Sequence, residues 1–191
     1  MFVGGHPTVN PPRTFGGQLM AQSLVASGRT VSEKLSLAAI STHFVNGGDP
    51  ELDIEFRVQR LRDERNFANR RVDAVQGDLL LSSALVSYLK DSPGLEHAVN
   101  PPVVADPETL PSIDEHLVGY EENDRIFAAT INHSVWFHRP LRFDDWVLYA
   151  TESPVASAGR GMGAGRYFDR DGALLASTIQ EGIVKYFPGR S

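Results

Sequence analysis

Hydrophobic residues near the start of the chain recur at the spacing of an amphipathic helix. Between Phe15 and Ser27 the larger apolar side chains are Leu19, Met20, Leu24 and Val25, which recur at helical spacing. Gly28 follows directly, and glycine is a common residue at a helix end. The pattern therefore predicts one helix over residues 15–27.

After this helix the hydrophobic pattern changes to short segments separated by turn residues. Four strands are predicted, over Leu37 to Asn46, Leu52 to Leu61, Asn66 to Val75 and Leu79 to Leu89. The segments between them, 47–50, 62–65 and 76–78, are rich in glycine and charged residues, as turns are. A helix followed by an antiparallel meander is an α+β pattern.

The second half of the chain repeats this plan after a proline-rich stretch. Residues Ser92 to Pro111 contain five prolines, at positions 93, 101, 102, 107 and 111. We interpret this segment as a linker. Ile113 to Phe127 could form one helix. Strands are then predicted over Ile131 to Arg139, Trp146 to Thr151, Gly161 to Phe168 and Ala173 to Tyr186, with turns at 139–145, 153–159 and 169–172.

Matching residues in the two halves suggest a duplication. In a first series, Phe44 matches Phe137, Ile54 matches Val147 and Phe56 matches Tyr149, all at the same distance along the chain. In a second series this distance is two residues longer: Arg71 matches Arg166, Gly77 matches Gly172 and Ser82-Ser83 match Ser177-Thr178. The extra residues fall in a turn, where insertions are tolerated. We therefore predict a double hotdog, in which each unit wraps an antiparallel sheet around a helix. The units are residues 1–91 and 112–191, joined by a linker at 92–111.

Composition limits the class of protein and its location. The 191-residue chain has no cysteine, so it cannot form disulfides, use a thiolate nucleophile or bind metal through cysteine. Its N-terminus has no basic start before an apolar run, and no segment approaches the roughly 20 apolar residues of a membrane helix. We expect a cytoplasmic protein. The net charge of −6 disfavours binding to nucleic acid.

Four segments together resemble the bacterial acyl-CoA thioesterase II family. They are RTFGGQLMAQSL at 13–24, NFANRRVDAVQ at 66–76, NHSVWFHRP at 132–140 and ASTIQEG at 176–182. The resemblance extends over most of the chain in the family's order. It implies the double-hotdog fold and hydrolysis of acyl-CoA to free fatty acid and CoA, without a cofactor or a metal.

The resemblance also implies a site in the second unit. The family uses a Thr, a Gln and an Asp to position and activate a water, and the matching positions are Thr130 and Gln180, with Asp124 as the candidate for the Asp. Asp114 is a poorer candidate. The stretch from His116 to Thr130 is shorter than in the family, so the second helix is expected to be shortened or missing.

Each site residue also has an ordinary structural interpretation. Gln180 lies in an otherwise apolar strand, where an amide could simply bond to neighbouring backbone. Thr130 is a residue type common in strands, and Asp124 could be a solvated residue at a helix end. A second hypothesis follows from the shortened unit: a catalytically impaired protein that binds acyl-CoA or an acyl chain.

Other residue patterns in the chain suggest different kinds of site. His133 or His138 with Ser134 suggests a serine hydrolase, but the chain has no G-x-S-x-G motif, and adjacent strand residues face opposite sides of a sheet. The glycine-rich segment 159–165 lacks the Lys-Ser/Thr ending of a phosphate loop, which favours a strand. The arginines at 57–71 could bind CoA phosphates or form a solvated face. Exposed sheet edges favour a homo-oligomer.

Overall fold

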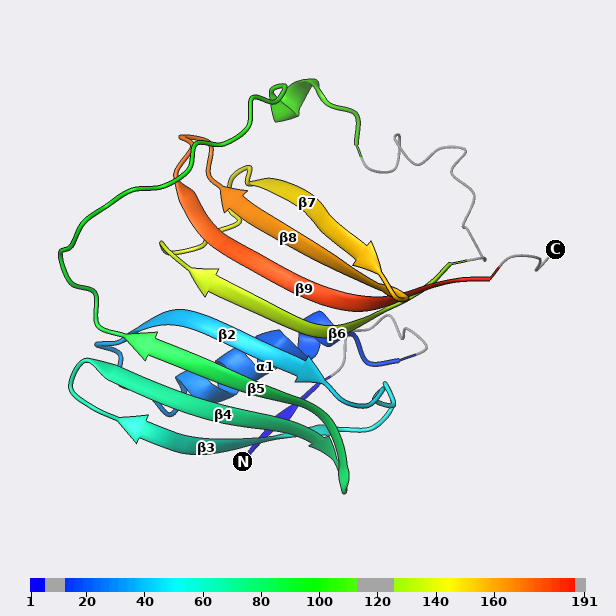
Figure 1. Ribbon diagram of the computed structural model, residues 1–191. Coiled ribbons are helices and arrows are strands. Elements are labelled where there is room, and N and C mark those ends of the chain that lie inside the picture. Colours follow the sequence, from blue (N-terminus) through cyan, green and yellow to red (C-terminus); the bar gives the residue numbers. More distant parts are fainter. Residues whose placement is uncertain (6–12, 113–125, 188–191) are drawn as a thin grey trace.

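One antiparallel sheet and one helix dominate the structure, a computed structural model that describes residues 1–5, 13–112 and 126–187. In these residues nine strands form a single sheet in the order β1-β3-β4-β5-β2-β6-β9-β8-β7 (Figure 1). The strands are β1 Phe2–Gly4, β2 Ser36–Phe44, β3 Ile54–Asp63, β4 Phe67–Gln76, β5 Leu79–Leu89, β6 Ile126–Phe137, β7 Leu148–Ser157, β8 Arg160–Phe168 and β9 Leu174–Tyr186. The α+β prediction is confirmed for the described residues.

Helix α1, Gly16–Gly28, confirms the predicted first helix. Phe15 before it has an extended backbone, and Leu19, Met20 and Ala26 are buried against the sheet. The core of the protein lies here, between α1 and strands β2 to β5, and Ile54, Phe56, Val72 and Leu81 belong to it. Burial of this apolar stripe stabilises a helix too short to persist in water alone.

A buried arginine ties the end of α1 to the β3–β4 hairpin. The Arg70 side chain is 1% exposed, and its Nη2 donates to Asp63 Oδ1 at 2.6 Å. Its Nε donates to Thr30 Oγ1 at 2.7 Å and its Nη2 to the Thr30 carbonyl at 2.9 Å. Its Nη1 donates to the carbonyls of Arg62 and Asn69. The guanidinium is therefore fully hydrogen-bonded in the interior, as a buried charge must be.

The first-half strands agree with the prediction to within two or three residues at their ends. The short strand β1 was not predicted. It pairs with β3 at the edge of the sheet, with Val3 opposite Glu55. Three residues are too few to show an alternating pattern, so only pairing with β3 reveals the strand.

The second-half strands begin or end at different residues from those predicted. Ile126 and Phe127 begin β6, so a helix through Phe127 is wrong for these two residues; the rest of that predicted helix lies outside the described residues. Residues 153–157 were predicted as a turn but belong to β7. The turn that follows is made by Ala158 and Gly159, both of which have positive φ.

The two halves of the sheet mirror each other. The order β3-β4-β5-β2 reappears as β7-β8-β9-β6, and β2 joins β6 in the middle. The predicted match between Ser82 and Ser177 is wrong by one residue. Phe44 pairs with Ser82, whereas its counterpart Phe137 pairs with Ala176, so Ala176 and not Ser177 takes the place of Ser82.

The two faces of the sheet differ in what they pack against: one face carries helix α1 and the other does not. We call the face that packs on α1 the helix face; on β2 it carries Ile40 and Thr42. The opposite, outer face carries Ser41, whose hydroxyl hydrogen-bonds that of Ser134 on β6 at 2.8 Å. Because paired residues in antiparallel strands share a face, the register extends this assignment through β6, β9 and β8.

No helix in the described part of the chain is long and apolar enough to span a membrane.

Candidate active site

A bulge in β6 turns Thr130 to the same face as Gln180. Thr130 pairs with Gly182 and Asn132 pairs with Glu181, so β6 advances by two residues where β9 advances by one. Since side chains alternate along a strand, a regular β6 would put Thr130 on the outer face. The extra residue reverses this, as bulges next to functional sites often do.

Thr130 and Gln180 are therefore diagonal neighbours on the helix face. Gln180 lies two residues before Gly182, the partner of Thr130, and diagonal neighbours in antiparallel pairs have Cβ atoms about 7–8 Å apart. Both side chains are exposed. On the other side of Gln180, β8 has Gly163 as the paired residue, so β8 places no side chain directly beside Gln180. The two residues are close enough to contact one small molecule together.

Two glycines keep this part of the face open. A Cβ on Gly182 would lie 3.0 Å from the Ala129 carbonyl oxygen, next to the bulge, so the backbones approach too closely for a side chain. A Cβ on Gly163 would meet Gln180 only at 3.7 Å, an ordinary contact. The glycine-rich segment lies in β8, as predicted from the missing phosphate-loop ending.

His133 is a member of this face that sequence reasoning did not assign to the site. It pairs directly with Gln180 on β9 and with Thr42 on β2. Its Nε2 is buried and has no hydrogen-bond partner within the described ranges. Burial lowers the pKa of His133 below its ordinary value of 6.5, because an apolar environment disfavours the charged form. The position of His133 next to Gln180 follows only from the register of the paired strands, because the sequence does not show which strands are neighbours.

The rejected serine–histidine arrangements do not form. Ser134, next to His133, faces the outer side and bonds to Ser41 across the β2–β6 junction. His138 bonds instead to Ser177, with 2.9 Å between Nε2 and Oγ. This agrees with the expectation that neighbouring strand residues face opposite sides.

The two aspartates considered for the site, Asp124 and Asp114, lie outside the described residues. Among the described residues no group of three or more His, Cys, Asp or Glu side chains could hold a metal ion.

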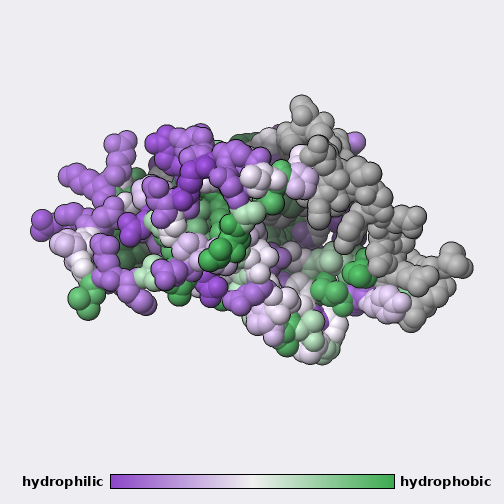
Figure 2. All heavy atoms as spheres, turned by 90° about the horizontal axis from the view of Figure 1, so that it is seen from above, coloured by the Kyte–Doolittle hydropathy of each residue, from purple (hydrophilic) through white to green (hydrophobic). Residues whose placement is uncertain are grey.

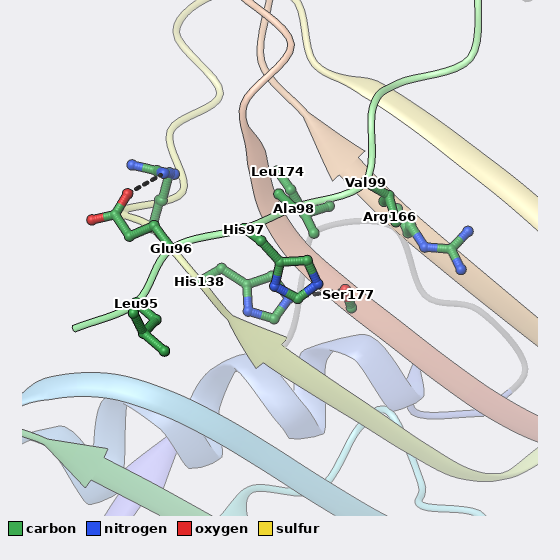
Figure 3. A pocket seen from close by; sticks show the side chains of 10 residues that line it. Leu95, Glu96, His97, Ala98, Val99, His138, Arg166, Leu174 and Ser177 are labelled. Carbon is green, nitrogen blue, oxygen red and sulfur yellow. Dashed lines mark hydrogen bonds and ion pairs between the residues drawn. The ribbon is translucent and has the colours of Figure 1, made fainter.

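A cavity of about 740 Å³ lies on the other side of the sheet (Figure 3). The linker segment 95–99 runs past the end of β6, and the cavity between them is lined by side chains that include His97, His138, Arg166 and Ser177. Ser177 pairs with Trp136 and Arg166, which places this cavity on the outer face. Burial lowers the pKa of His138. The cavity thus holds a serine–histidine pair, separated from Gln180 by the sheet.

A second cavity of about 710 Å³ lies between linker residues 101–107 and the start of β7. Trp146 and Leu148 line it together with several prolines and valines of the linker. Seen from above, hydrophobic side chains are exposed among hydrophilic ones near the middle of the molecule (Figure 2). Neither of these two cavities includes Thr130 or Gln180 in its lining.

Four arginines of β3 and β4 are engaged with acidic neighbours. Arg57 pairs with Glu55, Arg62 with Glu64, Arg71 with Asp73 and Arg70 with Asp63, at N–O distances of 3.1, 2.7, 3.0 and 2.6 Å. Arg70 is also buried. These pairs favour the interpretation of a solvated face over a site for CoA phosphates.

Comparison with known proteins shows which family has this arrangement. Residues 69–183 match the family model described as acyl-CoA thioesterase, and residues 4–89 match that of the acyl-CoA thioesterase N-terminal domain. The chain belongs to the acyl-CoA thioesterase family. The predicted resemblance to acyl-CoA thioesterase II is thereby confirmed.

Relatives of this thioesterase align over most of its length. It is 28% identical to mouse acyl-coenzyme A thioesterase 8 over 261 positions, which span 92% of this chain and 81% of the mouse protein. It is 27% identical to acyl-CoA thioesterase 2 of Haemophilus influenzae, over 97% of this chain and 92% of that protein. Because 261 positions exceed the 191 residues of the chain, the alignment contains long gaps in this chain.

Solved structures share its fold. An acyl-CoA thioesterase II from Mycobacterium marinum superposes with a TM-score of 0.82 at 26% identity, over 94% of this thioesterase and 92% of that chain. A protein described as having a hot dog fold, from Alicyclobacillus acidocaldarius, superposes with a TM-score of 0.71 at 17% identity, over 93% and 89%. The second likeness concerns the fold alone.

Proposed function

We propose that this thioesterase hydrolyses acyl-CoA to free fatty acid and CoA on the helix face of its second half. Thr130 and Gln180 hold the attacking water and polarise the thioester carbonyl, and Asp124 accepts the proton of the water. The observation that carries the proposal is the bulge in β6, which turns the Thr130 hydroxyl to the face of Gln180. This is the combination expected from the family resemblance.

The residue types suit the reaction. The water oxygen attacks the carbonyl carbon, the C–S bond breaks, and the proton released by the water returns to the thiolate of CoA. A thiol with a pKa of about 8.5 leaves readily, so little help is needed at sulfur. A Thr hydroxyl donates and accepts hydrogen bonds, and a Gln amide can do both at once. Donors aimed at the developing oxyanion supply much of the acceleration in acyl transfer.

We also infer that the chain is a double hotdog, with units at 1–91 and 112–191 and the linker at 92–111. The mirrored strand orders on either side of the β2–β6 junction support this division. In the part of the chain that the structure describes, β1 and β7 end the sheet, and such edges favour a homo-oligomer, which we expect in the cytoplasm. Light scattering at micromolar concentration tests the oligomer, and a monomer would contradict it.

Thiol release from acyl-CoAs of several chain lengths tests the activity. The proposal expects turnover by the wild-type chain that falls on replacement of Thr130 or Gln180. The long alignment gaps favour one alternative, a protein that binds acyl-CoA without hydrolysing it. Calorimetric binding of acyl-CoA with no thiol released would support that alternative and contradict hydrolysis.

A further inference from the structure

Two buried polar atoms belong to paired residues at the junction of the two halves, and neither has a hydrogen-bond partner among the described residues. Thr42 on β2 is 1% exposed, and its Oγ1 is unpaired. His133 on β6 is the residue paired with Thr42, and its buried Nε2 is unpaired as well. Residues paired in this way have Cβ atoms about 4.5–5.5 Å apart. The two unpaired atoms therefore belong to neighbouring side chains on the helix face.

Two such atoms side by side require an explanation. A buried polar atom without a partner is costly, and native proteins almost always satisfy it with protein or with an ordered water. The two atoms do not bond to each other. A single water between them would satisfy both, since internal waters typically bridge otherwise unsatisfied groups.

We propose that an internal water bridges Thr42 Oγ1 and His133 Nε2 and fixes the imidazole beside Gln180. His133 is then a positioning residue of the hydrolytic site, acting through Gln180, its direct partner on β9. The first half of the chain contributes to the site of the second half through Thr42. The catalytic role of His133 rests on the proposed hydrolysis. The bridging water does not depend on that proposal.

The strand and helix neighbours that the structure describes favour the neutral form of the imidazole. On the helix face the neighbours of His133 are Ile40, Thr42 and Phe44 on β2 and Thr178, Gln180 and Gly182 on β9, none of which is charged. Helix α1 contains no charged residue. A neutral imidazole has one N–H donor and one bare nitrogen. If Nε2–H donates to the bridging water, Nδ1 is left as an acceptor.

Substitutions at Thr42 separate this proposal from a merely structural defect. Thr42→Val removes the hydroxyl and keeps the branched shape. The proposal expects a lower melting temperature and a kcat reduced by roughly 10- to 100-fold with little change in KM, the size of effect that misplacement in a site produces. Thr42→Ser keeps the hydroxyl and should restore kcat. His133→Gln should lower kcat similarly, and adding Thr42→Val to it should cost little more.

The opposite results overturn the inference. If the Thr42 hydroxyl is simply unsatisfied, Thr42→Val removes a penalty, so the melting temperature rises and kcat is unchanged. A crystal structure of the full chain must show a water within hydrogen-bond distance of both atoms, and an empty gap there excludes the bridge. If the wild-type chain releases no thiol, the proposed function fails, while the melting temperatures and the water still decide the bridge.

Discussion

His133 and Gln180 lie directly opposite each other on β6 and β9, on the face of the sheet that carries α1. Two residue pairs further along, the bulge brings Thr130 to the same face. Three polar side chains thus meet on one surface although two of them, Thr130 and His133, would alternate to opposite faces in a regular strand. The account of hydrolysis depends on this local irregularity.

The bulge itself can be tested at Gly182. Gly182→Ala puts a Cβ 3.0 Å from the Ala129 carbonyl oxygen, so the backbone next to Thr130 must shift. We expect a loss of about 1–3 kcal/mol of unfolding free energy, typical of overpacking, together with reduced turnover. Urea unfolding and thiol release measure the two effects.

Gly163→Ala is the matched control for stability. Its Cβ would meet Gln180 at 3.7 Å, a normal contact, so the unfolding free energy should change little. Equal destabilisation by both substitutions would show that the close approach at the bulge has no special cost.

The titration of His133 should make stability rise with pH. Burial lowers its pKa in the folded protein below 6.5, so under mildly acidic conditions the unfolded chain binds more protons than the folded one. The penalty is therefore largest at low pH and vanishes above the unfolded pKa. His133→Gln should flatten the dependence below about pH 6.5, measured by urea unfolding. His138, whose pKa is also lowered by burial, contributes equally to both proteins. An unchanged slope would contradict the burial of His133.

Arg70 should be far more important for stability than an exposed arginine. Arg70→Ala removes the guanidinium that bonds Thr30, Asp63 and two further carbonyls, and each buried acceptor left without a partner typically costs about 1–3 kcal/mol. Arg57→Ala removes only an exposed pair with Glu55 and should cost less than about 1 kcal/mol. Thermal or urea unfolding compares them, and equal losses would refute the role of Arg70.

Sequence reasoning succeeded where a residue pattern by itself determines the element. Helix α1 has helical spacing followed by Gly28, and β5 was predicted with its observed ends, Leu79–Leu89. It failed for residues 153–157, whose small residues and Pro154 indicated a turn. Because β7 is the last strand of the sheet, a proline there need not donate to a neighbour. Edge position is a property of the whole sheet and cannot be read from a local pattern.

At the site, too, some features could be predicted from local sequence patterns and others depend on the assembled sheet. The motifs around Thr130 and Gln180 were recognisable in the sequence, and their roles remain predictions. Their meeting on one face depends on the extra residue in β6, and the position of His133 between Thr42 and Gln180 depends on which strands are neighbours. Neither follows from the spacing of residues along the chain, since bulges and strand order arise only when the sheet assembles.

The most direct test compares Gln180→Ala with Ser177→Ala in the release of thiol from acyl-CoA. The two residues lie on the same strand but on opposite faces, and Ser177 belongs to the cavity with His138. If water is activated on the helix face, Gln180→Ala should lower kcat on the order of 10²–10³-fold, as loss of one oxyanion donor does, and Ser177→Ala should leave it unchanged. Loss of turnover in Ser177→Ala with full activity in Gln180→Ala would contradict the account and assign the chemistry to the serine–histidine pair.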